Sequence, residues 1–187
     1  TMLRNEAPNL HSIFETKLRE SGSINGAMEA IGVFYLTKGL KSLSSIDPET
    51  VAFSFSNAVL EHVRKDSFEE TIRLLHRCHV PSSITIHQID YKDHLSNSLN
   101  NLRIPTSMWE SKWIPNDGYY TNRLRHPDIL NSFARSGFAI KLEKKKSWEH
   151  LPLPMSQMAR EFANYEVKDL LIQDSFLALS VERETAE

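Results

Sequence analysis

The chain has 187 residues, 40% of them hydrophobic, and a formal charge of −2, values typical of a globular protein with a packed core. This charge gives no global basic field, so nucleic acid is unsupported as a partner, and a mean hydropathy of −0.39 argues against a membrane protein. No apolar run approaches a membrane span and no signal-peptide pattern opens the chain, so we expect one cytoplasmic domain over residues 1–187.

The first expected element is a helix over residues 10–18, where apolar side chains recur at helical spacing. Asn9 is a candidate N-cap for this helix, and Gly22 is a candidate stop. The pattern over residues 27–36 fits a helix at its start and a strand at its end, so its type stays open.

A strand, a helix and a second strand are expected next. Val51–Ser56 has the pattern of a buried strand, and an interrupted helical pattern follows over residues 58–63 and 66–75. After Pro81, the β-branched run Ile84–Ile89 predicts another strand. A connection of this length favours two parallel neighbours joined by a right-handed crossover.

The remaining elements complete an α/β pattern. Pro127–Ser136 predicts a helix that ends before Gly137, and residues 155–162 predict a short one. Phe138–Glu143 and Ser175–Val181 predict late strands that could pair antiparallel at an edge of the sheet. The lysines of residues 141–146 are interpreted as a solvated strand edge.

Several segments carry a family resemblance. Val51–Val63 resembles the fourth-strand motif of class I S-adenosylmethionine-dependent methyltransferases, in which a strand ends at a small or polar residue before a Leu-Glu-His turn. Arg73–Pro81 looks like the family's helix and turn before the fifth strand. Further matches to a bacterial subgroup lie at His87–Leu95, Asn100–Arg103, Met108–Ser111 and Gly118–Arg123. The resemblance, over residues 35–181, implies a Rossmann-like methyltransferase sheet, mostly parallel with an antiparallel late edge strand.

The chain departs from the family in its cofactor loop. The family's Gly-x-Gly loop and its acidic residue for the ribose hydroxyls have no counterpart, because Gly22, Gly26 and Gly32 are too widely spaced. Ala52 stands where the family has an aspartate, and Ser82 follows Pro81 where the family has glycine. We therefore expect a sheet that is incomplete at its N-terminal side and lacks the first two strands. S-adenosylmethionine is the implied cofactor, bound weakly or not at all by this chain alone.

The expected cofactor contacts lie at the end of the Val51–Ser56 strand. Ser56, Asn57 and Ala58 would face the transferred methyl group, since ligands of open α/β sheets sit at the carboxyl ends of strands. Glu61 is a further candidate for the cofactor. The alternative for Asn57 is a turn residue that only closes the strand.

The expected catalytic residues are His94, Asp93 and His62, which could act as a base toward an acceptor hydroxyl. A structural role as a cap or packing residue is the alternative for His62. The acceptor is expected to contact His87, Asp90, Trp109, Tyr120, Asn122 and Arg123. A metal site and a purely structural hydrogen-bonded loop are the rivals for the His87–His94 segment, although no metal is expected. A surface cover that shields the sheet is the rival for residues 109–123.

The sequence thus favours methyl transfer to an unknown acceptor, a small or sugar-like molecule, by a chain that is weak or inactive alone. A degenerate methyltransferase-like module for binding or assembly is the second hypothesis, with a homo-oligomer covering the exposed sheet edge. A metal-dependent hydrolase using His87, Asp90 and His94 is the third.

Overall fold

The computed structural model describes residues 7–114 and 118–182, which form two compact units divided after Ser42. The first unit holds α2 (Pro8–Ser21) and α3 (Ile24–Ala30), and α4 (Leu40–Ser44) spans the division. Helix α2 begins at Pro8, before the expected cap Asn9, because the ring of proline suits a first helical position; it ends at Gly22 as expected. The single domain over residues 1–187 stays a prediction. No helix of the described residues is long and apolar enough to cross a membrane.

The second unit is built on a four-stranded sheet in the order β1-β2-β4-β3. Its strands are β1 (Val51–Asn57), β2 (His79–Asp90), β3 (Phe138–Ser147) and β4 (Ile172–Val181). β1 and β2 are parallel, and β4 is antiparallel to both β2 and β3, so three strands share one direction. The α/β class and the antiparallel late pair at one edge are confirmed. The antiparallel strand itself lies inside the sheet, and β3 forms the edge.

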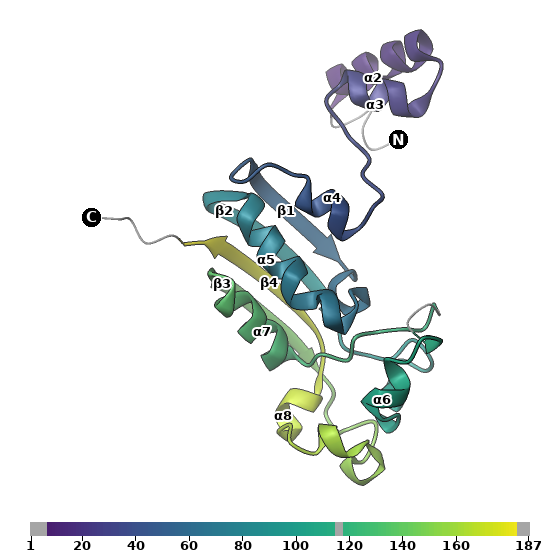
Figure 1. Ribbon diagram of the computed structural model, residues 1–187, viewed down its shortest axis with the longest axis vertical. Helices are drawn as coiled ribbons and strands as arrows, with labels where there is room; N and C mark the ends of the chain where they lie inside the picture. Colours follow the sequence, from purple (N-terminus) through teal and green to yellow (C-terminus); the bar gives the residue numbers. More distant parts are fainter. Residues whose placement is uncertain (1–6, 115–117, 183–187) are drawn as a thin grey trace, which may run out of the picture. The chain divides into compact units, whose positions relative to one another are not determined.

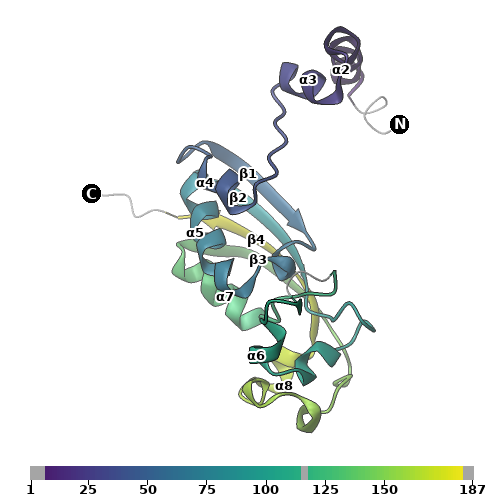
Figure 2. The ribbon, with the colours of Figure 1, turned by 45° about the vertical axis from the view of Figure 1, so that its right-hand side comes forward.

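Two amphipathic helices, α5 (Phe68–Cys78) and α7 (His126–Arg135), cover one face of this sheet (Figures 1 and 2). Their apolar faces meet the alternate residues of β2 and β4 that point toward them. The resulting core consists of Leu60, Phe68, Ile72, Ile89, Tyr91, Ile129, Phe133, Phe138, Ile172, Leu177, Leu179 and Val181.

The opposite face of the sheet carries exposed apolar side chains. Phe53 and Phe55 of β1 are 55% and 74% exposed, and their partners in β2 include the exposed Ile84. The expectation that Val51–Ser56 is buried is therefore wrong for one of its faces, because no helix among residues 43–114 and 118–182 covers that side. The strand type was predicted correctly, but β1 extends one residue beyond the predicted end, and β2 begins at His79 and runs through Pro81, five residues before the predicted start at Ile84.

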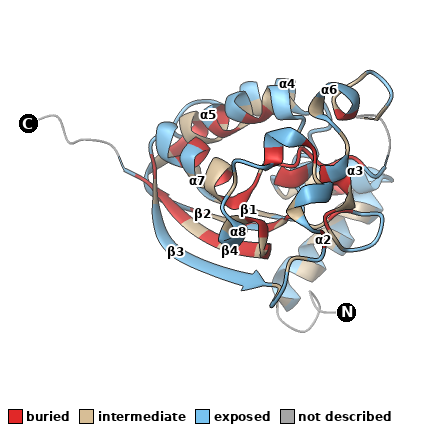
Figure 3. Cartoon of the chain, turned by 90° about the horizontal axis from the view of Figure 1, so that it is seen from below, coloured by how far each residue is buried: buried red, intermediate tan, exposed pale blue. Residues whose placement is uncertain are grey.

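The two sheet edges differ in chemistry. β3 carries a run of exposed lysines over residues 144–146, and it is drawn as exposed along almost its whole length in Figure 3. Charged side chains on an edge strand oppose pairing with another strand. The expected solvated edge at residues 141–146 is confirmed. β1, by contrast, has no charged residue among its seven.

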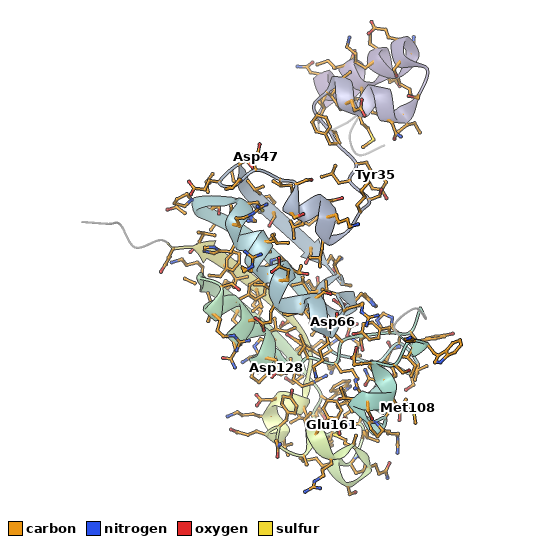
Figure 4. The ribbon with its side chains drawn as sticks, viewed as in Figure 1. Tyr35, Asp47, Asp66, Met108, Asp128 and Glu161 are labelled. Atoms are coloured by element: carbon orange, nitrogen blue, oxygen red, sulfur yellow. The ribbon has the colours of Figure 1, made fainter. Side chains whose placement is uncertain are left out.

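A second, smaller core lies beyond the end of the sheet, where short elements pack together. This core receives residues from η3 (Asn100–Arg103), η5 (Met155–Gln157), η6 (Arg160–Phe162) and α8 (Val167–Leu170). The other short elements of the unit are η1 (Leu60–His62), η2 (Lys65–Ser67) and α6 (Thr106–Trp109). The helix expected over residues 155–162 is two separate 3-10 turns, because the Ala159 N–H donates to Leu102 O and so breaks the helical pattern. Glu161, labelled in Figure 4, accepts a hydrogen bond from the Thr106 N–H.

Candidate functional site

The candidate site lies where β1 and β2 end. The two strands run in register, with Ser56 opposite His87 and Asn57 opposite Gln88, so the loops that follow them begin at the same edge of the sheet. This is the edge at which open α/β sheets bind ligands. One loop runs over residues 58–67, and the other is the long connection over residues 91–125.

Two histidines from these loops meet. The rings of His62 and His94 lie 4.8 Å apart in an edge-to-face arrangement, and both residues are exposed. His62 Nδ1 lies 2.8 Å from Tyr120 O, so Nδ1 must be the protonated nitrogen that donates to this carbonyl. The lone pair is then on Nε2, which suits His62 to accept a proton. Two of the three expected catalytic residues are thus brought together.

Asp93, the third, is buried and holds the loop that carries His94. Its Oδ1 accepts hydrogen bonds from the Leu95 and Ser96 N–H groups at 3.0 and 2.7 Å, and its Oδ2 accepts one from the Asn100 N–H at 2.5 Å. Only 1% of its surface is exposed. The geometry gives this carboxylate a positioning role, and a catalytic role for Asp93 stays a prediction.

Ser56 and His87 belong to a polar ladder across β1 and β2. His87 uses both ring nitrogens, Nδ1 with Ser56 Oγ at 2.7 Å and Nε2 with Thr85 Oγ1 at 2.8 Å, while Thr85 also bonds Ser54. The His87 ring stacks on Phe133 in the core. Burial lowers the pKa of His87 to about 4, helped by the nearby His79, so His87 is neutral at physiological pH. Its expected acceptor contact stays a prediction.

Glu61 of the first loop contacts Asp90, the last residue of β2. Glu61 is buried, its Oε1 accepts a hydrogen bond from the Asp90 N–H at 3.3 Å, and burial raises the pKa of its carboxyl group. Asp90 forms an ion pair with Lys92 at 2.9 Å. Among the described residues no three potential ligands are grouped to hold a metal ion. Glu61 Oε2 is buried without a hydrogen-bond partner among the described residues.

The turn after β1 is open. Asn57 and Ala58 are exposed, and Ala58 has the left-handed φ of 51° that is uncommon for a residue with a side chain. Its N–H donates to Gln88 O at 3.0 Å, which holds the turn against the end of β2. Strained backbone of this kind often occurs at binding sites.

Asn122 and Arg123 fasten the long connection to the rest of the unit. The Asn122 amide nitrogen donates to Leu60 O at 2.8 Å and to Val63 O at 2.9 Å. Arg123 has a left-handed φ of 59° and donates to two backbone carbonyls of the 101–104 segment at 3.1 and 2.5 Å. Burial lowers the pKa of Arg123 to about 10, which leaves it charged at neutral pH.

Trp109 and Tyr120 are buried beside them with stacked rings. Trp109 Nε1 donates to Thr121 O at 2.7 Å, and the Tyr120 hydroxyl accepts from the Lys65 N–H and donates to Glu110. Burial raises the pKa of Tyr120 to about 12. These contacts favour the alternative interpretation, a cover packed against the domain. Direct binding of an acceptor by Trp109, Tyr120, Asn122 and Arg123 stays a prediction.

Three exposed apolar residues lie close in sequence to His62, His94 and Tyr120, and two of them, Val59 and Leu95, were not singled out from the sequence. Val59, Leu95 and Tyr119 are 50%, 55% and 55% exposed. The only sequence signal was their position beside His62, His94 and Tyr120, because an apolar residue in a loop is as compatible with a core as with a surface.

Comparison with known proteins rests on fold alone, since no model of a protein family matches the sequence and no curated protein does. The solved structures of similar fold include S-adenosylmethionine-dependent methyltransferases. One from Methanosarcina mazei is 12% identical with a TM-score of 0.49, and the match covers 75% of this chain and 63% of that chain. One from Mesorhizobium loti is 15% identical with a TM-score of 0.47, and the match covers 87% of this chain and 73% of that chain.

A further match is a complex between the Haloferax volcanii Trm112 methyltransferase activator and a methyltransferase. It is 9% identical with a TM-score of 0.43, and the match covers 76% of this chain and 59% of that one. The chain thus spans about three fifths of the length of two of these structures, 59% and 63%.

Replacing Asp93 by alanine should loosen the loop that carries His94. Three backbone N–H groups would lose their acceptor, at a local cost of roughly 2–3 kcal/mol. Hydrogen exchange should then accelerate at the amides of Leu95, Ser96 and Asn100. The same replacement at the exposed Asp47 is the control and should leave these three amides unchanged; unchanged exchange in the Asp93 variant would refute the positioning role.

His87 should make stability depend on pH. Its pKa is about 4 in the folded chain against about 6.5 for a free histidine, so the unfolded chain binds the proton more strongly. The contribution of neutral His87 to the free energy of unfolding is complete above about pH 6.5. It is lost as the pH falls through 4, by about 3 kcal/mol in total. Urea unfolding across this range should show a weaker pH slope for His87→Gln than for the natural chain. Equal slopes would contradict the assignment.

Proposed function

We propose that this chain carries the acceptor-side half of an S-adenosylmethionine-dependent methyltransferase, with its site at the ends of β1 and β2. The observation that supports this most is the His62–His94 pair, because His62 belongs to the Leu-Glu-His turn that resembles the family motif and its ring faces a loop from the next strand. The acceptor would be a small molecule with a protic group.

His62 would act on the acceptor. Bound S-adenosylmethionine supplies an electrophilic methyl group, so the protein mainly has to align the acceptor and manage its proton. His62 Nε2 can take the proton of an acceptor hydroxyl, while the Tyr120 carbonyl keeps Nδ1 protonated and the ring oriented. His94 would confine the approach to His62 from one side.

The described residues fit only part of the cofactor. The exposed turn of Asn57 and Ala58 leaves room beside its backbone, and Ser56 lies at its start. Glu61, expected as a cofactor contact, accepts the Asp90 N–H with Oε1, while its buried Oε2 has no hydrogen-bond partner among the described residues. Gly22, Gly32 and Gly39 have open surroundings and do not form one loop.

S-adenosylmethionine should bind this chain weakly, and at the turn after β1. Titration followed by NMR should shift the backbone amides of Asn57 and Ala58 only at high cofactor concentration, because the ribose and adenine contacts are missing. Ala58→Tyr should abolish the shifts by filling the turn, whereas Ala58→Gly, which relaxes the left-handed backbone, should keep them. Tight, micromolar binding would refute the weak site, and shifts confined to other residues would refute its location.

An assembly module is the second candidate function, favoured by the chemistry of β1. This strand has no charge to oppose pairing, and it exposes Phe53 and Phe55 on the uncovered face of the sheet. A second copy covering this strand would bury both rings.

Light scattering after size-exclusion chromatography tests this candidate. The natural chain should elute as a dimer at high concentration, and Phe55→Lys should shift it to a monomer by placing a charge on the strand. Lys144→Ala on β3 is the control and should not alter the dimer. A natural chain that stays monomeric at every concentration would exclude the assembly role.

A further inference from the structure

The segment between α3 and α4 exposes an uninterrupted run of apolar side chains. Val33, Phe34, Tyr35 and Leu36 are 42%, 70%, 77% and 54% exposed, and this segment has neither helix nor strand (Figures 1 and 2). The Val33 N–H donates to Met28 O at 2.8 Å, whereas the three residues that follow form no backbone hydrogen bond within the described part of the chain. Exposed apolar runs of this length usually mark an interaction surface.

The composition of this segment suits a β-strand. Valine, threonine and aromatic residues favour extended backbone, and residues 33–37 contain Val33, Phe34, Tyr35 and Thr37 in a stretch of five. The backbone N–H and C=O groups of such a strand need hydrogen-bond partners wherever water is removed from them. Residues 33–37 therefore have the side chains of a strand, but no described strand lies beside them.

β1 in the second unit is a sheet edge that could accept a strand. The sheet order begins with β1, so no described strand lies along its outer edge. Phe53 and Phe55 of β1 are exposed, with their ring centroids 6.1 Å apart. Neither β1 nor residues 33–37 contain a charged residue, so no charge opposes their pairing. The other edge, β3, carries exposed lysines that oppose pairing, which leaves β1 as the edge open to a further strand.

We propose that residues 33–37 of one copy of the chain pair with the outer edge of β1 in a second copy, and that the two copies exchange these strands reciprocally. The proposal rests on the assembly role given above as the second candidate function, and it names the segment that covers β1. Because neighbours in a strand point to opposite faces, either Phe34 or Tyr35 would lie beside Phe53 and Phe55. The pairing would also supply backbone hydrogen bonds to residues 34–36.

The exposed area fits a dimer of moderate strength. At about 200 Å² for each aromatic side chain, the exposed parts of Phe34, Tyr35, Phe53 and Phe55 amount to roughly 500 Å² in each copy. A reciprocal exchange uses these surfaces in both copies, so it can bury up to about 1,000 Å², the size at which specific interfaces begin. The dimer should therefore form reversibly as the protein concentration rises.

Hydrogen exchange on the 187-residue chain tests the pairing at the backbone. At concentrations where light scattering shows a dimer, alternate amides of residues 34–37 should exchange about tenfold more slowly than in the dilute monomer, because each of them gains a hydrogen bond. A dimer in which all these amides exchange at the rate of the monomer would overturn the proposal.

Proline variants separate the backbone contact from the side chains. Neighbouring N–H groups of a strand point to opposite edges, so either Phe34→Pro or Tyr35→Pro removes a donor to β1, and at least one of them should be monomeric. Phe34→Tyr and Tyr35→Phe keep the N–H and an aromatic ring, and they should stay dimeric. All four changes lie outside the helices and strands, so both units should keep their folds.

The outcomes distinguish this exchange of strands from the assembly role itself. If both proline variants stay dimeric while Phe55→Lys is monomeric, the assembly role stands and the exchange is refuted. A natural chain that is monomeric at every concentration refutes both.

Discussion

The guanidinium of Arg125 holds together the part of the chain on which the site is built. It is fully buried and donates to Tyr91 O at 2.8 Å and to Ile172 O at 3.0 Å. Burial lowers its pKa to about 10, so it is still charged at neutral pH, and a buried charge is tolerated only where it is hydrogen-bonded. Because Tyr91 begins the long connection and Arg125 ends it, this one side chain closes the base of the loop and joins it to β4.

The closed connection separates two kinds of polar residue. Asp93, Asn122 and Arg123 are buried and spend their hydrogen bonds on backbone groups, which fixes the path of the chain. His62 and His94 are exposed, and their rings lie 4.8 Å apart. In the proposed function these rings would need rigid surroundings before the acceptor arrives, and the buried residues would supply that rigidity.

Much of the second unit was predictable because its signals are local. The β-branched run Ile84–Ile89, the proline start of α7 and the alternation after Gly137 gave strands and a helix of the right type. The exposure of Phe55 was not predictable, because an apolar strand has the same pattern whether one face or both are covered. The hydrogen bonds of buried side chains were also not predictable: those from Arg123 to the carbonyls of Asn101 and Ile104 join residues about twenty positions apart and leave no local signal in the sequence.

The position of β4 has a consequence for how the chain folds. β1, α5 and β2 are consecutive, but β2 completes its pairing with the last strand, where Ile84 lies opposite Ser180. Contacts between such distant residues form slowly, since a long loop must close first. On the ribosome, the edge of β2 that pairs with β4 therefore stays unpaired until residues 172–181 have been made. Late synthesis of a central strand makes the nascent chain dependent on protection from aggregation.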